Sequence, residues 1–119
     1  MLFEKASALA DRMFDAASVP VDYLRGGVAL AEGIPAKVGT QLFRIEDART
    51  GLAEMRRRTD FIVRRADLGG AEPQPRDVIA WRGAEYVVSA PAGEPCWRPH
   101  ARHGDNPTIR IHAEERHAQ

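Results

Sequence analysis

The sequence has a single cysteine, Cys96, so no disulfide can form within the chain and the cysteine count gives no reason to expect secretion. It also lacks an excess of either charge, because 17 basic residues balance 17 acidic ones. Bulk electrostatics therefore predict no attraction to nucleic acid or to an acidic membrane surface. No segment approaches the roughly 20 apolar residues that span a bilayer, and charges interrupt the apolar N-terminus, unlike in a signal peptide. We expect a protein of the reducing cytoplasm.

The length of 119 residues predicts one domain over residues 1–119 with a single core. Residues 2–17 favour an N-terminal amphipathic helix, since apolar side chains recur every three or four positions. These side chains are Leu2, Phe3, Ala6, Leu9, Ala10, Met13 and Phe14. Such a helix needs another surface to lie against.

Residues 19–113 are predicted to form a β domain, followed by a C-terminal tail over 114–119. We expect strands near 20–25, 34–44 and 59–65, in the two arms of a hairpin over 77–90, and near 96–100 and 108–114. Gly26 and Gly27 mark a first turn, and the residues of 66–76 form an exposed connection. The fold class predicted is mainly β, a small β-sandwich or barrel-like domain of six to seven strands with the N-terminal helix docked on it.

Alternation predicts which side chains of these strands face the core. Phe61 and Val63 share one face of their strand, with Asp60, Ile62 and Arg64 on the other. In the hairpin "DVIAWRGAEYVVSA", Ile79 and Trp81 share a face, as do Tyr86 and Val88, and Arg82-Gly83 makes the reversal.

Residues 44–58 are harder to assign, because helix formers surround Gly51 and the polar content is high. A short helix is one interpretation, but beyond Ile45 only Leu52 and Met55 are large and apolar, which favours a mobile loop that orders against a partner. From position 44 to 65 the chain has seven arginines (44, 49, 56, 57, 58, 64 and 65) against four acidic residues. Such a cluster is typical either of contact with DNA phosphates or an acidic protein, or of a solvated face. The candidate contact residues are Arg49, Arg56, Arg57 and Arg58.

Little in the sequence suggests chemistry. Cys96, His100, His103 and His112 are residue types that zinc prefers, but their spacing fits no compact zinc pattern, so we expect no metal and no other cofactor. A nucleophilic pair of Cys96 with His100 lacks a third group to orient the histidine. The glycines lie outside any phosphate-binding setting. Trp81 and Trp97 could form a base-stacking platform, although large aromatics on strands are more often core residues. No enzyme is expected.

Several segments together resemble the small head-tail joining (attachment) proteins of long-tailed phages and prophages. They are "FEKASALADRMF", the strand "DFIVRRADL", the hairpin "DVIAWRGAEYVV", and a C-terminal tryptophan, glycine and "IRIH". The resemblance implies a structural subunit, without catalytic residues, that forms a ring at the neck between the DNA-filled head and the tail. It implies other neck, connector or tail proteins as partners, a free protein that can be monomeric, assembly in the bacterial cytoplasm and a final place in the virion neck.

A second hypothesis from the residues themselves is a small nucleic-acid-binding β-barrel that uses the arginine cluster over 44–65. The two hypotheses differ in their response to salt, because binding through phosphates weakens steeply as the salt concentration rises. In the first hypothesis, contact with DNA is only incidental.

Overall fold

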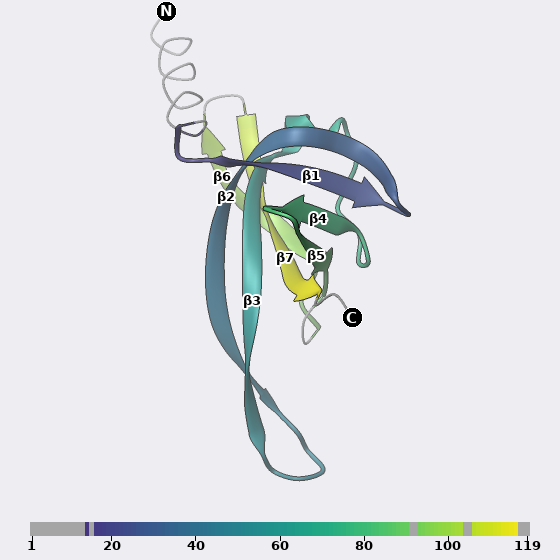
Figure 1. The fold of residues 1–119 in the computed structure, drawn as a ribbon. Coiled ribbons are helices and arrows are strands. Elements are labelled where there is room, and N and C mark those ends of the chain that lie inside the picture. The colour runs from purple at the N-terminus through teal and green to yellow at the C-terminus, as the bar shows by residue number, and fades with distance from the viewer. Residues whose placement is uncertain (1–13, 15, 91–92, 104–105, 117–119) are drawn as a thin grey trace, which may run out of the picture.

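The computed structural model describes residues 14, 16–90, 93–103 and 106–116 (Figure 1). The helix predicted over 2–17 falls almost entirely outside these residues. The elements of the described part are strands and one 3-10 turn, and of the predicted helix only Phe14 and Ala16 are described as helical. Nothing in that part is a helix long and apolar enough to cross a membrane.

Seven strands and the 3-10 turn follow one another along the chain. They are β1 (Val19–Arg25), β2 (Val28–Glu46), β3 (Ala53–Arg64), η1 (Arg65–Leu68), β4 (Val78–Trp81), β5 (Ala84–Val88), β6 (Trp97–His103) and β7 (Asn106–Arg116). The predicted mainly-β class is confirmed, and strand β7 includes the first three residues of the predicted tail.

The sheet closes on itself. Its order is β3-β2-β1-β4-β5-β7, and an additional antiparallel pairing of β3 with β7 completes the circle. Strand β6 is a seventh strand that pairs with β7 alone. The fold is therefore a closed six-stranded barrel with one extra strand, rather than a sandwich, and closure removes the exposed edges that an open sheet would leave.

The barrel interior is filled by the alternating side chains of its strands. Phe61 and Val63 are 0% and 1% exposed, as the alternation predicted. The ring of Phe61 meets that of Tyr86 edge to face, with 5.2 Å between centroids. The buried apolar cluster comprises Val21, Tyr23, Ile34, Ala36, Phe61, Val63, Leu68, Ile79, Tyr86, Val88, Cys96, Ile109, Ile111 and Ala113.

The hairpin over 77–90 forms as predicted, with Ile79 opposite Tyr86 and with Arg82 and Gly83 at the turn. Both turn residues have positive φ, 51° and 76°, which is the backbone of the tight turn that matches strand twist. Trp81 is only partly buried, packed against the core beside Phe61 and Tyr86. It therefore lies at the edge of the core rather than inside it.

Strands β2 and β3 are longer than the barrel requires. Strand β2 pairs with β1 only up to Ala36, and β3 pairs with β7 only from Thr59 onward. Between these points β2 and β3 pair only with each other, and Figure 1 shows them leaving the barrel as a projecting hairpin. Residues 44–58, expected as a loop, are thus strand, turn and strand.

Asp60 is an exception to the simple alternation of buried and exposed residues along β3. It lies on the face of β3 opposite to Phe61, yet it is only 1% exposed instead of facing water. Side chains of β3 and β7 surround its carboxylate there, as described below.

Candidate functional site

The projecting hairpin is the most distinctive surface of the molecule. Its ladder continues without a break from Ala36 opposite Val63 to Glu46 opposite Ala53. Over residues 37–58 neither strand pairs with a third strand, so the polar backbone groups along its two edges are available to other molecules. We call residues 37–58 the β2–β3 hairpin.

The turn at the end of this hairpin is well formed. The N–H of Asp47 donates to the carbonyl of Leu52 at 2.9 Å, and the N–H of Gly51 donates to the carbonyl of Asp47 at 2.8 Å. The Asp47 carboxylate also accepts the N–H of Arg49 at 2.8 Å, and Gly51 adopts a left-handed φ of 69°. These bonds give the tip a defined shape, with Leu52 at its edge.

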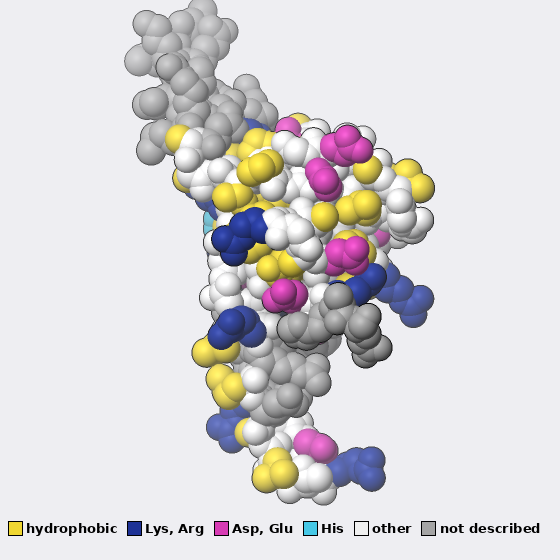
Figure 2. Space-filling view, viewed as in Figure 1, with side chains coloured by type: hydrophobic (Ala, Val, Ile, Leu, Met, Phe, Trp, Pro, Cys, Tyr) yellow, Lys and Arg dark blue, Asp and Glu magenta, His cyan; other side chains and the backbone are white. Residues whose placement is uncertain are grey.

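Apolar side chains on the hairpin are exposed to an unusual degree. Leu42, Leu52 and Met55 are 64%, 71% and 60% exposed. The strand register sets Leu42 opposite Arg57 and Met55 opposite Arg44, so apolar and basic side chains share one face. Figure 2 shows hydrophobic and basic side chains side by side along the hairpin to its tip. Contiguous exposed apolar groups of this kind are typical of an interaction site.

The arginines proposed as contacts occupy different environments. Arg49 lies in the exposed turn and Arg57 on an exposed face of β3, whereas nothing is described of the Arg56 side chain. Arg58 is only 12% exposed, with Nε 3.1 Å from Oδ1 of Asp60 and Nη1 3.6 Å from Oε2 of Glu94. Arg58 therefore belongs to the base of the hairpin and not to its free surface.

A buried polar cluster lies where the hairpin joins the barrel, and we call it the root cluster: Arg58, Asp60, Arg110 and His112. Asp60 faces His112 across β3 and β7. Nδ1 of His112 is 2.9 Å from Oδ1 of Asp60, and Nη1 of Arg110 donates to Oδ2 at 3.3 Å. A buried carboxylate needs such partners, since an unpaired buried charge is strongly destabilising. The cluster ties the base of the hairpin to β7.

A second buried carboxylate, Asp77, was given no role by the sequence analysis. It accepts hydrogen bonds from the Tyr23 hydroxyl, from Nε of Arg25 at 3.0 Å and from the N–H of Gln74 at 3.0 Å. These contacts hold the connection before β4 against β1. Sequence offered no signal for them, because Tyr23 and Asp77 are 54 positions apart.

The pKa values of Asp77 and Tyr23 follow from their surroundings. Burial acts to raise the pKa of Asp77, but hydrogen bonds from Arg25 and Tyr23 outweigh it and hold the pKa below its ordinary value. Burial first, and then the neighbouring Asp77, raise the pKa of Tyr23. Asp77 is thus ionised and Tyr23 un-ionised at neutral pH.

The residues considered for metal binding or nucleophilic chemistry do not converge in the described part of the chain. There, no three His, Cys, Asp or Glu side chains lie close enough to hold a metal ion. Cys96 is buried with its thiol toward the Pro73 carbonyl, His100 is exposed, and His112 contacts Asp60. Burial raises the pKa of the Cys96 thiol, which disfavours the reactive thiolate.

The two tryptophans are engaged with other side chains. The Trp81 ring lies 6.1 Å from Phe61 and has the Arg82 guanidinium 4.0 Å from its centroid. The Trp97 ring has the Arg65 guanidinium 5.3 Å away. Both residues pack against the core while partly exposed, so stacking on bases would compete with these cation–π contacts.

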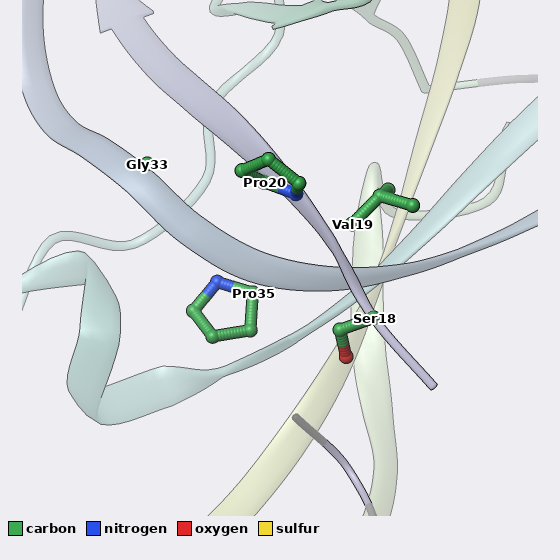
Figure 3. Close-up of a pocket in the computed structure, with 5 residues that line it drawn as sticks. All are labelled: Ser18, Val19, Pro20, Gly33 and Pro35. Atoms are coloured by element: carbon green, nitrogen blue, oxygen red, sulfur yellow. The ribbon is translucent and has the colours of Figure 1, made fainter. Parts of the chain in front are cut away.

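A small hollow of about 190 Å³ lies beside the start of β1. Figure 3 shows Pro20 of β1 and Pro35 of β2 next to it, and these two residues pair in register. Proline has no N–H to donate, and the Ser18 hydroxyl already donates to the Phe14 carbonyl. The hollow therefore offers few groups to recognise a ligand.

The barrel carries a projecting hairpin with exposed apolar and basic side chains, a feature typical of proteins that act by binding other proteins. Comparison with family models identifies that class further: the model of the phage head-tail joining protein family matches residues 1–119. The chain belongs to this family, whose role is structural, and the resemblance found in the sequence is confirmed. A search of the curated proteins finds no match.

Proposed function

We propose that this protein is a structural, non-catalytic subunit of a phage or prophage neck, joining the DNA-filled head to the tail through its β2–β3 hairpin. The observation that carries the proposal is the hairpin itself. It extends beyond the barrel and leaves Leu42, Leu52 and Met55 more than half exposed. Covering these side chains by a neighbouring subunit would remove apolar surface from water and so stabilise the assembly.

The charges of the hairpin favour an acidic partner surface. Arg49 and Arg57 have no ion-pair partner among the described residues, although both are exposed. We infer that they meet acidic groups on a neighbouring copy in a ring or on an adjoining neck, connector or tail protein. A protein of zero net charge can thus use local electrostatics while the free chain stays monomeric. Assembly would take place in the bacterial cytoplasm, before the subunit reaches the virion neck.

The distribution of the arginines supports a protein partner over DNA. Arg58 and Arg64 are only 12% and 11% exposed. Arg65 lies 3.6 Å from Glu72, and Arg44 lies 3.5 Å from Glu46. Few cations of the segment are left without an acidic neighbour, whereas a phosphate-binding surface needs several. Contact with DNA would then be incidental.

The experiment that tests this proposal replaces Arg49 and Arg57 together with serine and measures the joining of tail-less heads to tails in vitro. We expect the double variant to unfold at the same urea concentration as the parent protein and to lose joining activity. Arg98→Ser, an exposed arginine of β6 away from the hairpin, is the matched control. Normal joining by the double variant would contradict the proposal.

A change at Arg58 would not be an equally clean test. Its side chain is part of the root cluster, so Arg58→Ser would disturb the fold and the contact surface together. The nucleic-acid hypothesis is tested instead by measuring the affinity for duplex DNA at increasing salt concentration. If affinity for DNA were high and fell steeply with salt, and if Arg49 and Arg57 were needed for it, the nucleic-acid function would replace the one proposed.

A further inference from the structure

The outer wall of the barrel carries an apolar row that the core does not require. Leu24 of β1 pairs with Ala29 of β2 on one side and with Val78 of β4 on the other, and Val78 pairs with Val87 of β5. Paired residues of a sheet lie on the same face, and the buried core includes chain neighbours of Leu24, Val78 and Val87, namely Tyr23, Ile79, Tyr86 and Val88. The row therefore runs across the outside of four neighbouring strands, where polar side chains are the norm.

This wall is hollowed into a groove of about 330 Å³. Leu24, Val78 and Ala80 supply the apolar part of its lining. Glu85 and Arg116 also line it and form an ion pair of 3.1 Å with each other. That pair leaves no net charge, so the electrostatic character of the groove depends on the remaining charged residue of its lining, Arg76.

Arg76 is held in an uncommon backbone conformation, with φ of 79°. A non-glycine residue keeps such a conformation only where its surroundings impose it. Here the N–H of Arg76 donates to the carbonyl of Val88 at 2.9 Å, and the next residue, Asp77, is anchored by Tyr23 and Arg25. The backbone contacts thus fix the position of the Arg76 Cα atom beside the groove.

The guanidinium of Arg76 has no hydrogen-bond or ion-pair partner within the described residues, and the side chain is exposed. It differs in this respect from Arg116, which is paired with Glu85. A free guanidinium offers a planar pair of donors that matches a carboxylate. An apolar groove and an unpaired cation thus stand side by side on one face of the barrel.

We propose that this groove docks an extended segment of a partner protein in which a carboxylate side chain lies next to an apolar one. The apolar side chain would enter the groove over Leu24 and Val78, and the carboxylate would pair with Arg76. A basic segment would be repelled by Arg76, since the Glu85–Arg116 pair carries no net charge. The groove shares no residue with the β2–β3 hairpin, so this interaction is a second one and does not depend on the function proposed for the hairpin.

The test is a titration of the ¹⁵N-labelled full chain with the blocked dipeptide acetyl-leucyl-glutamate amide. Binding is followed by the amide signals of three glycines. Gly26 and Gly27 line the groove, and Gly83 lines a second hollow that shares Glu85 and Arg116 with it. We expect these signals to shift in a saturable way. The peptides with glutamine or lysine in place of glutamate should bind with an affinity at least about tenfold lower. This is the effect of losing one charge-assisted hydrogen bond.

Variants of the protein make the assignment specific. Arg76→Gln should weaken binding of the glutamate peptide about tenfold, and Arg76→Gly, which suits the left-handed backbone, should do the same while keeping the fold. Arg98→Gln on β6 and the Arg49→Ser, Arg57→Ser double variant should bind as the parent does. Equal shifts with the glutamine peptide, no shifts at the three glycines, full binding by both Arg76 variants, or the same shifts with inorganic phosphate would each overturn the proposal.

Discussion

Asp60 of β3 and His112 of β7 face each other across the seam that closes the barrel, with 2.9 Å between Oδ1 and Nδ1. Both side chains are about 2% exposed or less. The two arginines of the root cluster complete the surroundings of the carboxylate. The hairpin therefore leaves the barrel from a point that is fixed by ionic and hydrogen-bonding contacts as well as by backbone pairing.

The first prediction concerns this seam. Asp60→Ala should lower the free energy of unfolding by about 3 kcal/mol or more, because it leaves the arginines of the root cluster without their buried counter-charge. Urea denaturation gives the value. Glu46→Ala, at an exposed site of the hairpin, should change stability by less than about 0.5 kcal/mol. Equal midpoints for the two variants would show that the cluster does not stabilise the fold.

The second prediction is a pH dependence that comes from Asp77. Its pKa is lower in the folded protein than its ordinary value of 3.8, so its stabilising contribution is complete above that value and is lost as the pH falls through the folded pKa. Asp77→Asn should cost about 2 kcal/mol at neutral pH. The difference from the parent protein should shrink in strong acid. A difference that is constant from neutral pH to pH 2, measured by urea denaturation, would count against this account.

The third prediction compares two aromatic residues. Phe61→Ala should destabilise the protein by about 4 kcal/mol, as expected for a fully buried ring. Trp81→Ala should cost less, about 2 kcal/mol, because its ring is already partly exposed and leaves a smaller cavity. Thermal or urea unfolding of both variants tests the order. An unchanged midpoint for Trp81→Ala would mean that its packing against Phe61 and Tyr86 contributes nothing.

The fourth prediction concerns motion of the isolated chain. Amides of 41–46 and 53–57 should exchange with solvent faster than those of β1 and β7, because a ribbon of only two paired strands is marginally stable. Hydrogen exchange measured residue by residue tests this directly. Protection equal to that of the barrel strands would mean that the hairpin is rigid before it meets a partner.

The fifth prediction is that the purified protein carries no stoichiometric metal. The spacing of Cys96, His100, His103 and His112 motivates it, together with the burial of the Cys96 thiol. Elemental analysis after purification without chelators is the measurement. About one zinc ion per chain would contradict the prediction and direct attention back to these residues.

The sequence predicted those parts of the fold in which a local pattern reflects burial. Alternation identified Phe61 and Val63 as core residues because one face of their strand is covered and the other is not. The turn at Arg82-Gly83 was predictable because few residues adopt positive φ. The sequence left a sandwich and a barrel-like domain both open, and the structure shows the barrel. The choice between them leaves no local signal, since the pairing of β3 with β7 joins segments about 50 positions apart.

The hairpin and its root were missed for different physical reasons. Residues 44–58 show no apolar alternation, because the side chains described over 44–57 are exposed and face no core, and so they resembled a loop. Asp60 has the alternation of a surface residue, and only its distant partners on β7 reveal that it is buried. Among the proposed contacts, the sequence could not distinguish Arg58, which pairs with Asp60, from the exposed Arg57 next to it.

Closure by the last strand has a consequence for the timing of folding. Strand β7 supplies partners for β3, β5 and β6, so the circle of strands cannot be completed until residues 106–116 have left the ribosome. Contacts between residues so far apart in sequence are slow to form, and a barrel of this kind is expected to fold in milliseconds to seconds. The β2–β3 hairpin, whose contacts are local, can form much earlier, within about 1–10 μs. Its exposed apolar side chains can thus be presented by a nascent chain before the barrel is closed.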